Sequence, residues 1–258
     1  MNDEDKIPFT SHLDELRRRL IIAFIAVAIG FAASYGFKEY LFEILVRPLK
    51  LVMAEGDTLI FTNLPEAFFT YLKVAFLTGI GLASPVLLYQ FWMFVAPGLY
   101  DKEKRLLLPI VFLSTLFFVG GAMFGYFIVF PYGFEFFLGF ATETIRPMPS
   151  MKEYLSFAAK LLLAFGIVFE LPLVITFMAK LGLVTVPFLK RNRKYAVLLF
   201  FAGAAILTPP DVVTQVMMAL PLMLLYEVSI VGARIFGRKP LETADAEDTS
   251  AEDHPPSE

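Results

Sequence analysis

The chain has 258 residues, of which 57% are hydrophobic and 18% charged, with a mean hydropathy of +0.67. A water-soluble domain of this size needs more polar surface, so the composition excludes that class and indicates a protein surrounded by lipid. The formal charge of −3 is uninformative because the charges are segregated, while zero cysteines and two distant histidines (His12, His254) exclude disulfides, iron–sulfur clusters and the usual zinc sites.

The N-terminal segment, residues 1–19, carries charges of both signs and is expected to be cytoplasmic. Ser11 with Asp14 three residues later matches a capping box, which predicts a helix that starts there and continues into the first apolar run, 20–37. That run is longer than the apolar part of a secretory signal, so we interpret it as a retained span. The alternative is cleavage near residues 32–34.

Six apolar runs bounded by charged residues predict an all-α integral membrane protein with six transmembrane helices, at about 20–37, 74–95, 106–130, 156–179, 195–208 and 212–233. Together they form a transmembrane domain over residues 20–235. Residues 236–258 contain seven acids beyond position 240 and only Arg238 and Lys239 as basic residues, which predicts a disordered acidic cytoplasmic tail.

The basic residues predict the orientation. With the N-terminus inside, fifteen Lys and Arg fall in the cytoplasm and seven outside. The positive-inside rule therefore favours both termini in the cytoplasm, which agrees with an even number of spans.

The last two spans form an unusual pair. Residues 195–208 would make a helix roughly 21 Å long, against a hydrocarbon core of about 30 Å, and Pro209 and Pro210 cannot continue it. We therefore predict short helices five and six, with local thinning of the bilayer around residues 195–226. The alternative is a re-entrant pair that does not cross.

One acid lies deep in the fourth span. Glu170 is roughly 14 Å from the cytoplasmic end by helix rise, and Pro172, which lacks an N–H, predicts a kink beside it. Ionisable residues at such depth mark functional sites by default. The alternative is a protonated Glu170 that only holds neighbouring helices together.

Other polar residues have ordinary explanations as well as functional ones. Gln215, Thr208 and Glu227 together indicate a polar seam on the last hairpin, although each is also a routine partner in helix packing. Glu15 can pair with Arg18 or Arg19 along one helix face, and Glu103 lies in a charged loop. No phosphate loop, HExxH helix or GxSxG elbow occurs, which argues against an enzyme.

Several motifs, which follow one another in order along residues 10–235, carry a family resemblance. They are Ser11-His12-Leu13 with Glu15-Leu16-Arg17 and Arg19-Leu20, then Pro65-Glu66-Ala67-Phe68, Tyr89-Gln90 with Trp92, Phe94, Pro97-Gly98-Leu99 and Glu103, Phe165-Gly166 with Phe169-Glu170 and Pro172, Thr208-Pro209-Pro210-Asp211 with Gln215, and Leu225-Tyr226-Glu227. The pattern resembles the TatC family, the core subunits of twin-arginine protein translocases.

The resemblance implies a cup-shaped protein of the bacterial inner membrane that receives twin-arginine signal peptides of folded proteins. Its implied partners are TatA-type and TatB-type single-span proteins, further copies in a receptor complex, and membrane lipid, with no nucleic acid and no cofactor. Transport would be driven by the proton-motive force.

The resemblance also implies roles for individual residues. They are signal-peptide binding for Glu15, Arg17, Phe94 and Glu103, an intramembrane polar site at Glu170, partner-helix docking for Thr208, Gln215 and Glu227, and structural roles for Pro48, Pro172, Pro209, Pro210 and Asp211. Two carboxylates near one surface suit paired guanidinium groups, because each arginine makes a bidentate fork that lysine cannot reproduce.

Two other functional hypotheses remain. A proton-coupled transporter of small molecules would use Glu170 as its proton site, but we find no inverted repeat or paired helix interruption in the sequence. An intramembrane enzyme would need paired catalytic residues at depth, and none is visible.

Overall fold

The computed structural model describes residues 9–54, 57–95, 107–142, 144, 146–207 and 212–237, and within these ranges the chain is helical apart from its connections and one isolated bridge between Ile60 and Ser150. The all-α prediction is confirmed. The elements are α1 (Phe9–Tyr35), α2 (Lys38–Lys50), α3 (Glu66–Val95), α4 (Leu107–Phe124), the π-helix η4 (Gly125–Val129), α5 (Phe130–Leu138), α6 (Met151–Val168), α7 (Leu171–Lys180), α8 (Val186–Arg191), α9 (Arg193–Leu207) and α10 (Val212–Phe236).

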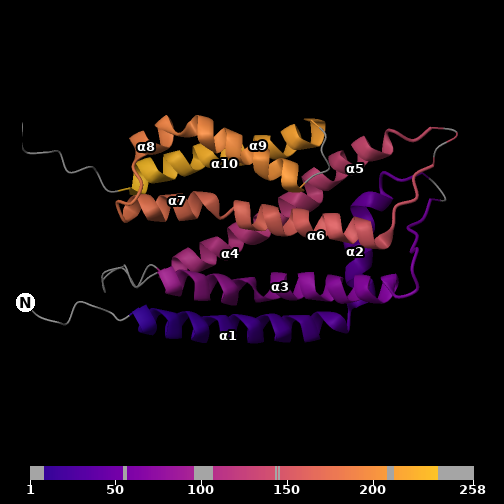
Figure 1. Cartoon of the computed structure of the whole chain (residues 1–258), viewed down its shortest axis with the longest axis horizontal. Coiled ribbons are helices and arrows are strands. Elements are labelled where there is room, and N and C mark those ends of the chain that lie inside the picture. Colours follow the sequence, from indigo (N-terminus) through magenta and orange to yellow (C-terminus); the bar gives the residue numbers. More distant parts are fainter. Residues whose placement is uncertain are drawn as a thin grey trace, which may run out of the picture.

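The long helices run roughly along one axis, with α1 and α3 at one side of the bundle and α8, α9 and α10 at the other (Figure 1). α1 begins, and α3, α7 and α10 end, at the same end of the bundle, which we call the amino end. At the opposite, far end lie α2, the start of α6 and the connections that precede α3 and α6. The two ends therefore carry different sets of residues.

Four helical segments of the described chain are long and apolar enough to cross a membrane: Glu66–Val95, Leu108–Leu138, Met151–Lys180 and Gln215–Phe236. The pair α1–α2, bent by 88°, counts as a fifth if it is one span. α9 has only 15 residues, or roughly 22 Å of helix rise, so the expected short fifth helix is confirmed but does not reach across a 30 Å core by itself. Six spans remain a prediction.

Two boundary predictions are wrong. The sixth helix is not short, because α10 continues for 25 residues with Pro221 inside it. The third predicted span, 106–130, extends to Leu138 through η4 and α5. Pro131, at the start of α5, cannot donate to the carbonyl four residues earlier, and the wide π turn directly before it accommodates that missing bond.

α2 is a helix that the sequence analysis treated as part of an outer loop. Its apolar residues recur at helical spacing, and Phe42, Leu45, Val46 and Leu49 are buried in the main core. Pro48 is also buried, two residues before the last residue of α2, and the Ile44 carbonyl oxygen that it cannot bond accepts from the hydroxyl of Tyr126 instead. Its predicted structural role thus fits its place in the packing of α2.

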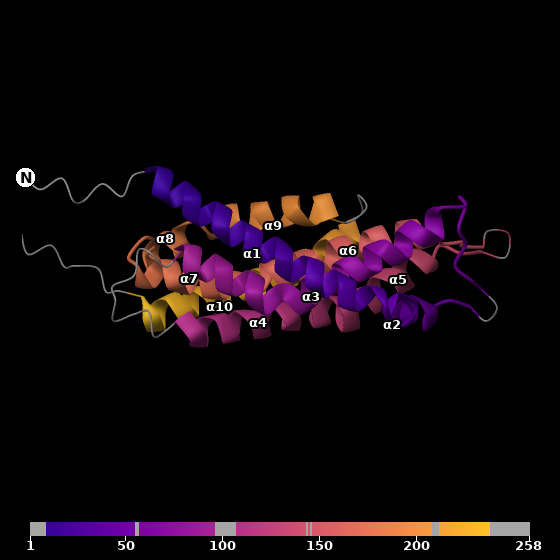
Figure 2. The ribbon, with the colours of Figure 1, turned by 90° about the horizontal axis from the view of Figure 1, so that it is seen from below.

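α1 and α3 cross at two glycines (Figure 2). A Cβ added to Gly30 would lie 2.5 Å from the carbonyl oxygen of Gly79, and one added to Gly79 would lie 2.6 Å from the backbone nitrogen of Phe31. Backbones that approach this closely gain van der Waals contact, which is the main attraction available to helices in lipid. The α1–α3 pair makes the most extensive contact between two elements of the described chain.

The predicted kink at Pro172 is confirmed. α6 ends at Val168 and α7 begins at Leu171, with Phe169 and Glu170 between them. The proline ring removes one donor and clashes with the preceding turn, so the span is divided into two helices. The break places Glu170 at the junction.

Candidate functional site

A cavity of about 520 Å³ lies between the first half of α1 and the last turns of α3, near the amino end. Four of its eight lining residues are charged. It consists of Asp14, Glu15, Arg18, Arg19, Ile22, Tyr89, Gln90 and Met93.

Glu15 and Arg19 form the centre of this cavity. The Glu15 carboxylate accepts hydrogen bonds from both Nε (3.0 Å) and a terminal nitrogen of Arg19, one helical turn away. Arg19 also donates to Oε1 of Gln90 on α3 at 3.3 Å. The expected intrahelical pairing of Glu15 is therefore confirmed, with Arg19 as its partner. The result is a guanidinium group held by a carboxylate and an amide in a pocket with room beside it.

The other residues expected to bind a signal peptide lie around the cavity or outside the described chain. Arg17 is exposed on α1 and does not line the cavity. Phe94 is half-buried on the last turn of α3, next to Met93, which does line it. Glu103 lies outside the described residues. The structure thus brings Glu15 and the end of α3 together.

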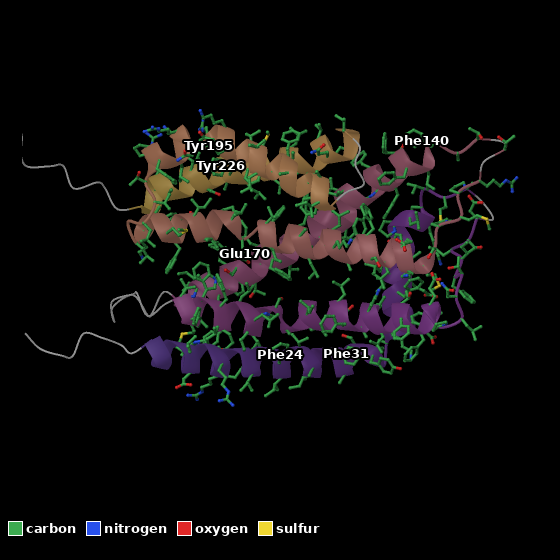
Figure 3. The ribbon with its side chains drawn as sticks, in the orientation of Figure 1. Phe24, Phe31, Phe140, Glu170, Tyr195 and Tyr226 are labelled. Carbon is green, nitrogen blue, oxygen red and sulfur yellow. The ribbon has the colours of Figure 1, made fainter. Side chains whose placement is uncertain are left out.

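Glu170 lies between the two sides of the bundle, at the α6–α7 break (Figure 3). Glu170 is 9% exposed, and neither of its buried carboxyl oxygens meets the geometry of a hydrogen bond with a described residue. The hydroxyl of Ser114 on α4 is a polar neighbour of this carboxyl group. A buried carboxyl group without a partner is energetically unfavourable, so this position is suited to receive a donor from another molecule.

Ser114 connects Glu170 to the only tryptophan of the chain. The indole Nε1 of Trp92 donates to Ser114 Oγ at 2.6 Å, and both side chains are almost fully buried. Trp92 also packs edge-on against Phe177 of α7, with ring centroids 4.9 Å apart. The junction between α3, α4 and α7 therefore contains one polar pair in an apolar cluster.

We expect Ser114→Ala to lower stability by about 1–3 kcal/mol, because the buried indole N–H loses its acceptor. Trp92 is the sole tryptophan, so its fluorescence reports the change directly during thermal or denaturant unfolding. Trp92→Phe removes the orphaned donor, and the double variant should be less destabilised than the sum of the two single ones, with unfolding of all four proteins followed by circular dichroism because two of them lack the tryptophan. Strict additivity would contradict the predicted coupling.

The polar residues of the last hairpin do not form one seam, which corrects that prediction. Gln215 donates to the backbone oxygen of Phe201 on α9 at 2.9 Å, whereas Glu227 accepts from Arg193 at the start of α9 at 2.7 Å. They are separated by twelve residues, or roughly 18 Å of helix, and so fasten different parts of the hairpin. Thr208, Pro209, Pro210 and Asp211 lie outside the described residues.

A site at the far end was given no role by the sequence analysis. Glu66, the first residue of α3, is 5% exposed and accepts from Ser150 Oγ at 2.6 Å and from the backbone nitrogen of Lys152 at 3.1 Å. Its other oxygen accepts from the nitrogen (2.8 Å) and hydroxyl (3.0 Å) of Thr62 and from the nitrogen of Asn63 (3.3 Å). We call this network the Glu66 latch.

The latch joins the connection before α3 to the connection before α6. The Ile60–Ser150 bridge reinforces it, with Ile60 donating to Pro149 and Met151 donating to Ile60 through the backbone. The sequence signals were the Pro65-Glu66-Ala67-Phe68 motif of the family resemblance and an acid in the first turn of a helix, where it complements the helix dipole. Neither identified Ser150, 84 residues away.

Within the described part of the chain, no three His, Cys, Asp or Glu residues are grouped in a way that would hold a metal ion. The candidate sites are thus one guanidinium-binding cavity, one buried carboxyl group and one polar latch.

Comparisons with known proteins place these features in a family. Residues 11–221 match the family model described as Sec-independent protein translocase protein (TatC). The chain is 69% identical over 92% of its length to the Sec-independent protein translocase protein TatC of Desulforapulum autotrophicum, covering 88% of that protein, and 49% identical to that of Magnetococcus marinus, covering 97% of this chain and 93% of the relative. A crystal structure of a twin-arginine translocase receptor, TatC, superposes with a TM-score of 0.79 at 44% identity, covering 88% of this chain and all of the other.

Proposed function

This chain belongs to the TatC family of Sec-independent protein translocases, and from that premise we propose that it is the subunit that binds twin-arginine signal peptides of folded proteins at the bacterial inner membrane. With TatA-type and TatB-type single-span proteins it mediates the export of those folded proteins, driven by the proton-motive force. Both termini are cytoplasmic, so the amino end of the bundle faces the cytoplasm and the far end faces outward. The observation that carries the proposal is the Glu15–Arg19–Gln90 arrangement.

The proposed binding step is an exchange of guanidinium groups. Arg19 already occupies Glu15 and Gln90, which supports the idea that these acceptors fit an arginine side chain. Arg19 directs both of its bonds to Oε1 of Glu15, and an arginine of the signal peptide would replace it and engage both carboxylate oxygens as a bidentate fork. The side chain of Glu15 is 35% exposed and that of Arg19 is 16% exposed, so the site is accessible from water while partly shielded from it.

The second arginine of the signal is assigned to Glu103, on the connection between α3 and α4. Phe94 would contact the apolar part of the signal, and Arg17, exposed on α1, would lie at the edge of the site. Each well-formed charged pair is worth about 1.5–3 kcal/mol. Lysine makes a weaker, unforked contact, which is the physical basis proposed for arginine selectivity.

Glu170 is proposed to receive a polar group from a partner helix or from the inserted signal. Its buried, unpartnered carboxyl group supports this role, since a donor arriving through the membrane would gain a strong hydrogen bond. Partner helices would dock on the α9–α10 hairpin near Gln215, with Glu227 and Arg193 at its cytoplasmic end. No enzymatic step is part of this function.

We expect Glu15→Gln to weaken binding of an Arg-Arg signal peptide about tenfold and of a Lys-Lys peptide much less. The reason is that a glutamine amide is neutral and has one acceptor oxygen, so it cannot accept the bidentate fork of a guanidinium group. Photocrosslinking from positions 94 and 103 to the peptide measures this. Glu43→Gln, an exposed acid on α2, is the matched control.

Equal losses for both peptides with Glu15→Gln would contradict the exchange of guanidinium groups. A transporter of small molecules would instead show proton-linked uptake in liposomes that depends on Glu170 and ignores signal peptides.

A further inference from the structure

A second open cavity, of about 460 Å³, lies at the far end between α5, α6 and the end of α9. Three of its lining residues are aromatic: Phe134 and Phe137 from α5 and Phe157 from α6. Two charged residues of α6, Glu153 and Lys160, line it as well. The proposed signal-peptide site lies at the opposite end, so this cavity needs a different explanation.

Lys160 is unusual within its span. It forms no ion pair or hydrogen bond with any residue of the described chain, although it lies in the apolar segment Met151–Lys180. Twenty residues separate it from Lys180, which is at most roughly 30 Å along α6 and α7 because the two helices are divided at Glu170, and this is close to the hydrocarbon thickness. If Lys180 lies at the cytoplasmic boundary, Lys160 lies at the outer boundary, where lipid phosphates are found.

Glu153 lies two helical turns farther out on the same face of α6. The seven-residue separation corresponds to roughly 10 Å, which two long side chains can shorten by leaning toward each other. The cavity therefore presents a cation at phosphate depth and a carboxylate on its aqueous side. A headgroup with a phosphate and an outer ammonium has the complementary order of charges.

α9 leaves this cavity open. Ile206, the penultimate residue of α9, lines the cavity, and the helix ends one residue later. A 15-residue helix therefore stops near the level at which α6 still continues outward to Met151. The aromatic side chains that line this cavity are apolar and suit acyl chains, which meet aromatic side chains at membrane interfaces.

We propose that this cavity binds a zwitterionic phospholipid of the outer leaflet, with its phosphate on Lys160, its primary ammonium toward Glu153 and an acyl chain along Phe134, Phe137 and Phe157. The proposal goes beyond signal-peptide binding and uses the same orientation of the chain. Phosphatidylglycerol offers Lys160 the same phosphate, but its glycerol head is neutral and brings no cation to Glu153. The ligand class is thus phosphatidylethanolamine rather than phosphatidylglycerol.

Native mass spectrometry of the detergent-purified full chain, titrated with phosphatidylethanolamine or phosphatidylglycerol, tests this assignment. Lys160→Gln should reduce phosphatidylethanolamine binding about tenfold, and Lys160→Arg should retain it within about twofold, because both cations bind phosphate. Lys152→Gln is the matched control, since Lys152 is an exposed lysine on the same helix that does not line the cavity. Glu153→Gln should weaken phosphatidylethanolamine about threefold without weakening phosphatidylglycerol.

Three results would overturn the proposal. They are equal losses for Lys160→Gln and Lys152→Gln, equal binding of both lipids by the unmodified chain, and displacement of the lipid by inorganic phosphate at low millimolar concentration. The last would indicate a site for free anions. Signal-peptide crosslinking of the same variants is expected to be unchanged, so a failed lipid site and a failed signal-peptide site are distinguished, and Trp92 fluorescence verifies that each variant is folded.

Discussion

Glu66→Ala is expected to lower the Tm of the purified protein on the order of 10 °C and to separate the two far-end connections. The reason is the number of donors that share this carboxylate. Ser150 and Lys152 approach one oxygen, and Thr62 and Asn63 the other, in a site that is 5% exposed. Removing this buried acceptor takes away the shared partner of several donors at once, so both connections lose their attachment to α3.

The measurement is thermal unfolding in detergent, together with hydrogen exchange of residues 57–65 and 146–152. Glu66→Gln should give an intermediate fall, because one of its two terminal atoms can no longer accept. Glu39→Ala, an exposed acid in the first turn of α2, is the control and should leave the Tm unchanged. A latch that contributes nothing would show the same Tm for both alanine variants.

Gly79→Ala is expected to destabilise the bundle by about 1–3 kcal/mol and to displace α1 from α3. The new methyl group would lie 2.6 Å from the nitrogen of Phe31 and 3.0 Å from the carbonyl carbon of Gly30, both backbone atoms. No side-chain rotation relieves such a contact, so one helix must move. In a membrane this separation removes the close packing on which the pair depends.

Gly81→Ala provides the matched control on the same helix. A Cβ at Gly81 meets nothing within 4 Å, so the substitution should be neutral or stabilise α3 by up to about 1 kcal/mol through helix propensity. Cysteine crosslinking between α1 and α3, combined with unfolding monitored at Trp92, measures both effects. Similar behaviour of the two alanine variants would refute the close-packing argument.

The features predictable from sequence were local ones. Apolar runs predicted the long helices, Pro172 predicted the break beside Glu170, and the spacing of Glu15 and Arg19 predicted their pairing. α2 was missed although Phe42, Leu45, Val46 and Leu49 recur at helical spacing, because a 13-residue amphipathic helix is too short and too polar to resemble a span.

The features that could not be predicted depend on contacts between distant residues. Arg19 meets Gln90 across 71 positions, and Glu66 meets Ser150 across 84. The expected polar seam failed for the same reason, since Gln215 and Glu227 share a helix but their partners, Phe201 and Arg193, lie at different levels of α9. A sequence pattern gives the residue types in such networks but not their partners.

The Glu66 latch makes the two ends of the bundle mechanically unequal. At the far end, the Glu66 carboxylate joins α3 to the start of α6 by hydrogen bonds, whereas at the amino end α3 meets α7 through the Trp92–Phe177 ring contact. Both rings are buried and their contact is apolar, so this junction depends on packing rather than on hydrogen bonds to a carboxylate. We therefore expect α3 and α7 to separate more readily at the amino end than α3 and α6 do at the far end, with the α6–α7 break at Glu170 as the point of bending.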